Sequence, residues 1–369
     1  MANRVVFKKL PENKLSKREI KDFNIEIGEL ERKAIKASKG ECCLICGKPC
    51  SSFCSSHSIP KFVLRGISTK GLILRGMDFI KTTGIIKPTG VSSVLTFSSI
   101  CNDCDNTFFK EYESPDAFKK HLSPLAINEI AIKNYLRYVF KRKKELFQFK
   151  LLLEEMDEKE IYDISLHRSV ENKLLLSRID VEEYETSLKM LLRKRDEDYF
   201  YVIDEINLDY NTHFAYQGFV ALINGFDNKI INDTFNYDTR YKMQRLGVAI
   251  FPFENSTKIV LFCKHGSTRL RSFYKTFLKL SLEEKLYAIN YLLLINEEEW
   301  CVPASFDRKV LNKQTMDLIK QTQDVEFRTD NPFPSAEEVH DAIRANLGDR
   351  YVIQTKGNIY NFLAKQKEK

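Results

Sequence analysis

Two Cys-x-x-Cys pairs are the residues of this chain whose types and spacing most clearly indicate chemistry. Cys43 and Cys46 form the first pair, and Cys101 and Cys104 form the second. A C-x-x-C turn presents two thiolates on one side of a tight loop, and two such turns supply the four soft ligands of a tetrahedral zinc ion. The sequence therefore predicts one structural Zn²⁺ bound by these four cysteines.

A single histidine, His57, lies between the two pairs in the stretch Ser-Ser-His-Ser-Ile-Pro. A rival zinc site would use His57 as a ligand together with Cys43, Cys46 and Cys54, in a local C-x-x-C…C-x-x-H pattern. That arrangement would leave the second C-x-x-C pair without a metal. Four cysteines in two C-x-x-C turns fit a structural site better, and His57 would then not be a zinc ligand.

The distribution of cysteines also favours metal binding over disulfides. Seven of the nine cysteines lie between residues 42 and 104, and the N-terminus shows no apolar core followed by a cleavage site. Cys263 and Cys301 stand among apolar residues and are predicted to be buried thiols. Apolar stretches fall well short of the roughly 20 residues that cross a bilayer. We expect a cytoplasmic protein that makes no membrane contact.

Positive charge is concentrated beside the cysteines. The formal net charge of the chain is +7, and residues 41–90 contain seven Lys or Arg against Glu41 and Asp78, a local balance of 7 − 2 = +5. Such a surplus attracts a phosphate backbone. Lys61 and Arg65 are therefore predicted to contact DNA or RNA, and a solvated basic loop is the alternative.

The elements that must position these residues indicate an α+β protein with several parts. We predict an N-terminal helical arm at 1–40, a zinc-binding module at 41–122, an α+β domain of unknown role at 123–320 and a tail at 321–369. Within the module, runs at 71–75 and 91–97 are β-prone.

Helices and strands of the remaining chain follow from periodicity and capping signals. Ser123 and Pro124 are typical of a helix start, and Ser281 with Glu284 has the capping-box spacing. Helices are predicted at 14–36, 124–147, 150–196, 281–296 and 335–346. Strands are predicted at 199–204, 214–223, 247–253 and 258–263, in an antiparallel sheet.

The cysteine and histidine segment resembles the HNH nucleases that carry a zinc knuckle. Their ββα-metal unit reads C-x-x-C, then Asp-His-Ile-x-Pro, then C-x-x-C followed by His or Asn. The matching residues here are Cys43-Leu-Ile-Cys46, Ser56-His57-Ser58-Ile59-Pro60 and Cys101-Asn-Asp-Cys104-Asp105-Asn106. The resemblance covers about 65 of the 369 residues, and it implies a zinc-stapled, HNH-like ββα-metal module at the N-terminal side of the chain.

The resemblance also implies roles for individual residues. His57 corresponds to the general base that activates water, and Asp105 to the ligand of a catalytic Mg²⁺ or Mn²⁺, with Asn106 as the alternative ligand. Ser56 stands where the family has a metal-binding Asp, which leaves the implied site one anionic ligand short. The ion could instead be held through one of three further acids, Glu111, Glu113 or Asp116.

These observations give one leading function and one rival. The leading function is a metal-dependent endonuclease that hydrolyses phosphodiester bonds of DNA or RNA, and by analogy with similar nucleases it belongs to restriction or phage defence. The rival is a non-catalytic zinc module that binds nucleic acid or a partner protein of a defence system. Ser56 favours the rival, and the intact His-x-Ile-Pro favours the enzyme.

Overall fold

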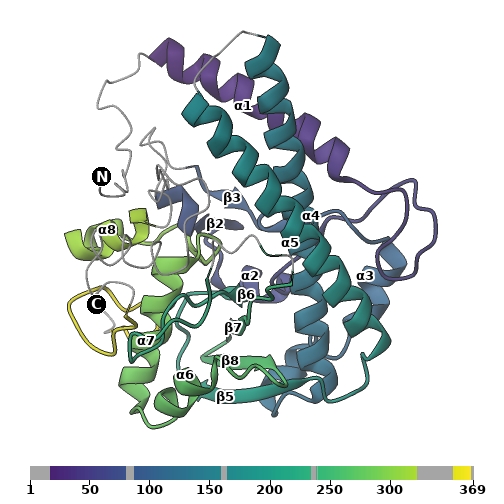
Figure 1. Cartoon of the computed structure of the whole chain (residues 1–369). Coiled ribbons are helices and arrows are strands. Elements are labelled where there is room, and N and C mark those ends of the chain that lie inside the picture. Colours follow the sequence, from purple (N-terminus) through teal and green to yellow (C-terminus); the bar gives the residue numbers. More distant parts are fainter. Residues whose placement is uncertain are drawn as a thin grey trace.

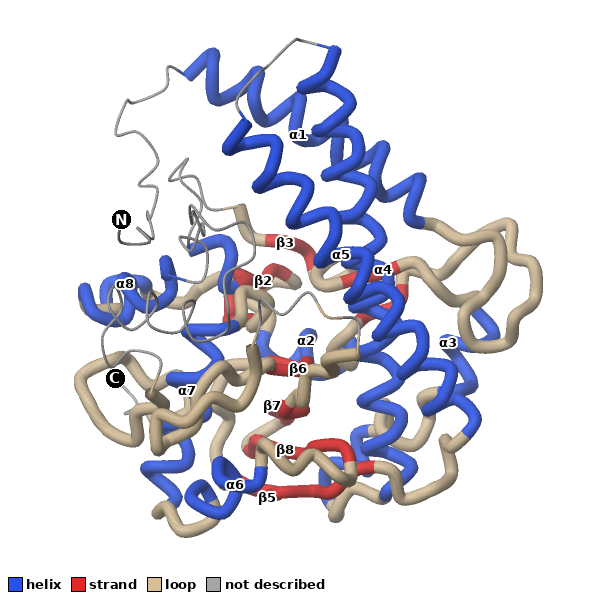
Figure 2. The backbone as a smooth tube through the Cα atoms, viewed as in Figure 1, coloured by secondary structure: helices blue, strands red, loops and turns tan. Residues whose placement is uncertain are grey.

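The structure is a computed structural model that describes residues 17–79, 87–158, 164–233, 238, 240–321 and 352–366. It combines helices with antiparallel sheets (Figures 1 and 2), in agreement with the predicted mixed class. The predicted helix at 335–346 lies outside the described residues. None of the helices that the structure describes has the length and apolar character needed to cross a bilayer.

A small unit of two strands and one helix carries His57 and the second cysteine pair. Strand β1 (Ser56–His57) pairs antiparallel with β4 (Thr96–Phe97), and helix α3 (Asn102–Phe108) follows β4 closely. Helix α2 (Lys61–Ile67) begins directly after β1 and buries one of its faces. We refer to β1, β4 and α3 as the ββα unit, although α2 and two strands of a second small sheet lie between β1 and β4 in the sequence.

A second small sheet joins this region to a segment more than 200 residues away in the sequence. Strand β2 (Leu72–Arg75) lies between β3 (Thr89–Gly90) and β9 (Cys301–Pro303). Of the predicted strand at 91–97, the last two residues alone form a strand, which is β4. Residues 91–95 form a turn, because the Gly90 carbonyl accepts hydrogen bonds from the N–H groups of Ser93 and Val94.

Helix α4 (Pro124–Glu158) contacts strand β4 of this unit, and two further long helices pack on α4. Helices α4 and α5 (Ile164–Arg193) pack side by side, and α1 (Lys17–Ser38) packs against α4 (Figure 1). The predicted start of α4 is confirmed, since Ser123 Oγ accepts a hydrogen bond from the Ala126 N–H at 3.1 Å. The break predicted between the helices at 124–147 and 150–196 is not present, because α4 continues to Glu158.

The larger sheet has four antiparallel strands in the order β5-β8-β7-β6. Their bounds are β5 (Phe200–Leu208), β6 (Tyr216–Val220), β7 (Leu246–Phe253) and β8 (Ser256–Lys264). Each strand overlaps one that the sequence predicted. Ladder pairing is interrupted between Val202 and Asp204, where β5 has an irregularity opposite β8.

Both faces of β6, β7 and β8 are buried, which explains why these strands are mostly apolar. Strand β5, at one edge of the sheet, keeps exposed residues such as Tyr201. In β8, Val260 and Phe262 belong to the apolar cluster formed with α4 and the ββα unit, whereas Ile259 and Leu261 belong to the cluster on the opposite face. The helices on that opposite face are α6 (Arg271–Phe277), α7 (Leu282–Asn296) and α8 (Lys313–Gln321). Short 3₁₀ turns occur at Gly76–Phe79, Pro115–Lys119 and Arg308–Val310.

The apolar packing is continuous across the predicted boundary between 41–122 and 123–320. One cluster contains Ile59 from the zinc-binding region, Ile130 from α4 and Phe262 from β8, all three with no exposed surface. The division into separate domains therefore stays a prediction, and the ββα unit is held by the rest of the chain.

Candidate metal centre

The four predicted zinc ligands come together in space. The Sγ atoms of Cys43, Cys46, Cys101 and Cys104 all lie within 4.8 Å of one another, and Cys46 Sγ is 4.0 Å from Cys101 Sγ. Four sulfurs at about 2.3 Å from a tetrahedral zinc ion would be about 3.8 Å apart. The spacing of the thiols therefore fits a structural zinc ion, and the thiol-rich donor set fits soft metals in general.

The rival local site is not formed. Cys54 is buried beside Asp105. Burial, and after it the charge of Asp105, raises the pKa of the Cys54 thiol to about 12. The His57 ring binds a backbone carbonyl and is not a member of the cysteine cluster. Among the described residues, the second C-x-x-C pair completes the cluster in their place.

Backbone hydrogen bonds of the first knuckle direct its thiols inward. The Cys43 N–H donates to the Lys48 carbonyl and the Gly47 N–H donates to the Cys43 carbonyl, both at 2.9 Å. Gly47 has a φ of +70°, a left-handed conformation that glycine adopts without steric cost. The second pair is joined to the first because the Cys101 N–H donates to Cys43 Sγ at 3.4 Å.

The thiols of the cluster differ in how readily they ionise. Burial opposes ionisation of Cys43, but hydrogen bonds from the backbone N–H groups of Cys46, Cys101 and Ile45 lower its pKa to about 7. The pKa of Cys104 is raised, first by burial and then by hydrogen bonds with the neighbouring thiols. Four thiols in one place cannot all ionise without a compensating cation, and a bound Zn²⁺ supplies that charge.

The His57 ring is held in one orientation at the end of β1. His57 Nε2 lies 2.8 Å from the Val91 carbonyl oxygen, and because a carbonyl accepts hydrogen bonds, Nε2 carries the proton. The neutral ring then has its lone pair on Nδ1. Burial lowers the pKa of His57, and Lys61 and Lys133 lower it further against the opposing effects of Val91 and Asp105. The imidazole is therefore neutral at pH 7, as a general base must be.

Asp105 is enclosed by hydrogen-bond donors. Ser56 Oγ donates to Asp105 Oδ1 at 2.6 Å, Lys133 Nζ donates to the same oxygen at 3.0 Å, and the Cys54 thiol also contacts the carboxylate. The Lys133 side chain is 1% exposed and reaches Glu113 Oε1 at 2.5 Å as well. Ser56 thus acts as a donor to Asp105 at the position where the HNH pattern has a second carboxylate.

This environment does not fit a catalytic Mg²⁺ or Mn²⁺ at Asp105. Mg²⁺ prefers open carboxylates and keeps several of its waters, whereas Asp105 and Glu113 both converge on a buried ammonium group. Glu111 accepts a hydrogen bond from Ser123 at 3.0 Å, and Asp116 pairs with Lys119 at 3.1 Å on the surface. Neither of these two acids joins Asp105.

Two groups of this centre were not found by sequence reasoning. The Val91 carbonyl carries no side-chain signal, so nothing in the sequence marks it. Lys133 does leave a signal: it shares a helix face with Ile130 and Leu136, both fully buried. A charged residue on an apolar helix face requires an opposite charge nearby.

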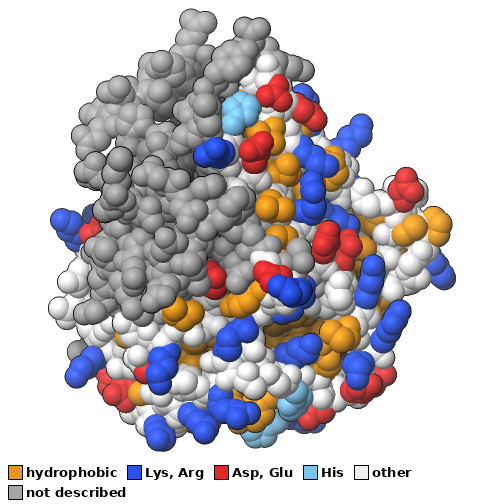
Figure 3. All heavy atoms as spheres, viewed as in Figure 1, with side chains coloured by type: hydrophobic (Ala, Val, Ile, Leu, Met, Phe, Trp, Pro, Cys, Tyr) orange, Lys and Arg blue, Asp and Glu red, His pale blue; other side chains and the backbone are white. Residues whose placement is uncertain are grey.

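The predicted nucleic-acid contacts lie on α2. Lys61 and Arg65 are both exposed and are four residues apart, so they share one helix face. Arg75 is engaged elsewhere, in an ion pair of 3.3 Å with the buried carboxylate of Asp78. On the face shown in Figure 3, Lys and Arg are interspersed with Asp and Glu.

Comparison with known proteins found no matching family model, no matching curated protein and no matching solved structure.

Proposed function

We propose that this chain cleaves phosphodiester bonds in DNA or RNA at an HNH-like centre in which His57 is the general base. The observation that carries the proposal is the 2.8 Å contact between His57 Nε2 and the Val91 carbonyl. It fixes the tautomer whose Nδ1 can accept a proton, and the lowered pKa keeps this nitrogen unprotonated at pH 7. The paired strands β1 and β4 followed by α3 support the same assignment.

The cysteine cluster has a structural part in this proposal. Four protein thiolates complete the coordination of Zn²⁺ and leave no open position for substrate or water. A zinc ion there would join residues 43–46 to the start of α3. It would hold α3 next to β1, and thereby Asp105 beside Ser56.

Substrate binding is assigned to charged and polar groups around His57. Lys61 and Arg65 would contact the phosphate backbone, and Lys61 is close enough to His57 to affect its pKa. Asn106, exposed on α3 one position beyond Asp105, is assigned to the scissile phosphate. Asp105 is assigned a positioning role, because its contacts with Ser56 and Lys133 fix the strand that carries His57.

A second candidate is a zinc module that binds nucleic acid without cutting it. The enclosed Asp105 favours this candidate, since the carboxylate that would bind a divalent ion is already neutralised by Lys133. The two candidates share the zinc ion and the basic face of α2, and they differ in whether the His57 base is used.

Cleavage assays with matched variants separate the two candidates. Plasmid DNA, single-stranded DNA and structured RNA are incubated with wild type, His57→Ala and His121→Ala, each with Mg²⁺, with Mn²⁺ and without divalent ions. We expect His57→Ala to lose about 10²-fold or more of the cleavage rate while retaining zinc and substrate binding. His121 is exposed and lies outside the centre, so its variant should cut like wild type.

If wild type binds these substrates but leaves all of them intact under every condition, the non-catalytic candidate replaces the nuclease. The expected roles in restriction or phage defence, with a partner protein, and the cytoplasmic location stay predictions from the sequence.

A further inference from the structure

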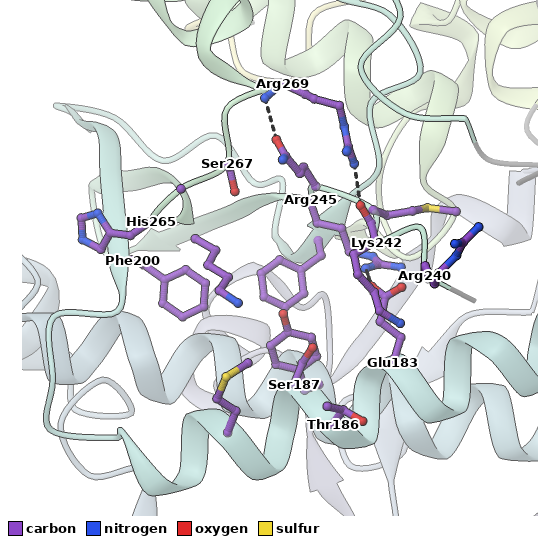
Figure 4. A pocket seen from close by; sticks show the side chains of 17 residues that line it. Glu183, Thr186, Ser187, Phe200, Arg240, Lys242, Arg245, His265, Ser267 and Arg269 are labelled. Atoms are coloured by element: carbon purple, nitrogen blue, oxygen red, sulfur yellow. Dashed lines mark hydrogen bonds and ion pairs between the residues drawn. The ribbon is translucent and has the colours of Figure 1, made fainter. Parts of the chain in front are cut away.

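A pocket remote in sequence from the cysteine pairs lies beside the four-stranded sheet. It has a volume of about 520 Å³, within the roughly 300–1,000 Å³ typical of small-molecule sites. Figure 4 shows Thr186 and Ser187 of α5 on one side and Ser267 and Arg269 on the opposite side. Phe200, at the start of β5, lines the pocket as well.

The lining of this pocket is strongly cationic. Its charged groups, His excepted, are five Lys or Arg side chains and one carboxylate, Glu183. The cationic residues are Arg240, Lys242, Arg245, Lys264 and Arg269. An accumulation of one sign of charge in a concave site raises the local concentration of ligands of the opposite sign.

Two of these cations are already compensated. Arg245 forms an ion pair with Glu183, which also lines the pocket. Arg240 pairs with Asp238 at 2.7 Å. Neither guanidinium therefore demands an anionic ligand.

Arg269 and Lys264 are not compensated in this way. Arg269 Nη2 donates to two neutral oxygens, the Lys242 carbonyl and Asn232 Oδ1, and its buried Nε finds no acceptor in the described part of the chain. Lys264 Nζ lies over the Tyr199 ring at 5.2 Å. Neither cation has a carboxylate partner among the described residues, so an anion that reaches both would supply the missing charge.

The other residues that line the pocket indicate the chemical class of the ligand that carries the anionic group. Phe200, Phe219 and Tyr135 form an aromatic wall of the pocket, in which they are 5%, 5% and 8% exposed. Ser187, on α5, adds a hydroxyl group. An inorganic phosphate ion would fill a small part of the volume and would make no contact with this aromatic wall. A ligand with both a phosphate and a flat apolar ring system would use the whole site.

We propose that this pocket binds a phosphorylated nucleotide, with its phosphate at Arg269 and Lys264 and its base against the Phe200 and Phe219 side. This site is independent of the proposed nuclease centre, since none of its residues belongs to the cysteine cluster or contacts His57.

The test is isothermal titration calorimetry of the full-length protein. The probes are ribonucleoside mono-, di- and triphosphates, the matching nucleosides and inorganic phosphate. We expect at least one nucleotide to bind at least tenfold more tightly than both its nucleoside and inorganic phosphate. Lys264→Gln and Arg269→Gln should each weaken this binding about tenfold, the effect of losing one charge-assisted hydrogen bond. The control Lys275→Gln removes an exposed charge outside the pocket and should bind like wild type.

The proposal is overturned if no nucleotide binds, if the nucleoside or inorganic phosphate binds as well as the nucleotide, or if both pocket variants bind like wild type. Lys264 is exposed, so its variant keeps the test valid even if Arg269→Gln fails to fold. His57→Ala should retain nucleotide binding, which separates this site from the proposed nuclease function.

Discussion

Lys133 and Asp105 form an ion pair of 3.0 Å between helices α4 and α3, with the lysine side chain 1% exposed. This pair connects the long-helix layer to the ββα unit at the residue that follows the last cysteine of the cluster. Lys133 also contacts Glu113 and lies over the Phe109 ring at 4.0 Å. The ammonium group is therefore the centre of a buried network that holds α3 in place.

Replacing Lys133 with Met should be strongly destabilising, because two carboxylates would remain together without their cation. Breaking a buried ion pair on one side typically costs about 3–5 kcal/mol. Urea unfolding of the zinc-loaded protein measures the change in the free energy of unfolding. The control Lys119→Met removes a surface pair with Asp116 and should change stability by less than about 1 kcal/mol.

A combined variant distinguishes charge from shape at this position. Lys133→Met with Asp105→Asn and Glu113→Gln removes the uncompensated negative charge and should recover part of the loss. A Lys133→Met protein as stable as wild type would show that the network does not support α3.

The sequence predicted those parts of the fold that local chemistry determines. Ser123 and Ser281 mark helix starts because each caps its own helix, and the sheet strands were predicted because β-branched and aromatic residues are grouped there. The C-x-x-C spacing likewise determines which thiols can meet.

Groups that depend on distant packing were not predictable in the same way. Lys133 meets Asp105 through the placement of α4, and the Val91 carbonyl meets His57 through a turn that the β-prone sequence at 91–97 does not suggest. The cationic pocket gathers residues from α5, β5, β8 and the loops beside them, so no single stretch of sequence indicates it.

The pH dependence of stability tests the environment of His57. Its pKa in the folded protein is below the ordinary value of 6.5, so between these two values the unfolded chain binds more protons. The contribution of His57 to stability should therefore be fully present above pH 6.5 and should decrease as the pH falls from 6.5 towards the folded pKa. His57→Gln, whose amide can still donate to the Val91 carbonyl, should lose this part of the pH dependence. If wild type and His57→Gln change in stability by the same amount as the pH falls below 6.5, the assignment is contradicted.

The basic face of α2 should act through counterion release. Lys61→Gln and Arg65→Gln should weaken binding to all nucleic-acid sequences alike, and each should reduce the slope of log K against log salt concentration by about one. Fluorescence anisotropy with labelled DNA and RNA over a range of salt concentrations measures that slope. Arg75→Gln serves as the comparison, because Arg75 is already paired with Asp78. A slope that both α2 variants leave unchanged would place the binding surface elsewhere.

Close packing at Gly76 joins the zinc-binding region to the C-terminal part of the chain. A Cβ atom at Gly76 would lie 2.5 Å from Trp300 Cε2 and 2.8 Å from the Glu298 carbonyl oxygen. Gly76→Ala should therefore destabilise the protein by about 1–3 kcal/mol, the usual cost of overpacking. Gly66→Ala is the control, since nothing lies within 4 Å of its Cβ position in helix α2. It should be neutral or stabilising by up to about 1 kcal/mol. Equal stability of the two variants would argue against this junction.

Native mass spectrometry of the intact chain tests most directly whether one zinc ion joins the two cysteine pairs. We predict one zinc per chain in wild type and in Cys54→Ser, and loss of zinc in both Cys43→Ser and Cys101→Ser, because each of these two removes one of four ligands. Retention of zinc in Cys101→Ser together with its loss in Cys54→Ser, or a wild-type protein without zinc, would contradict the account.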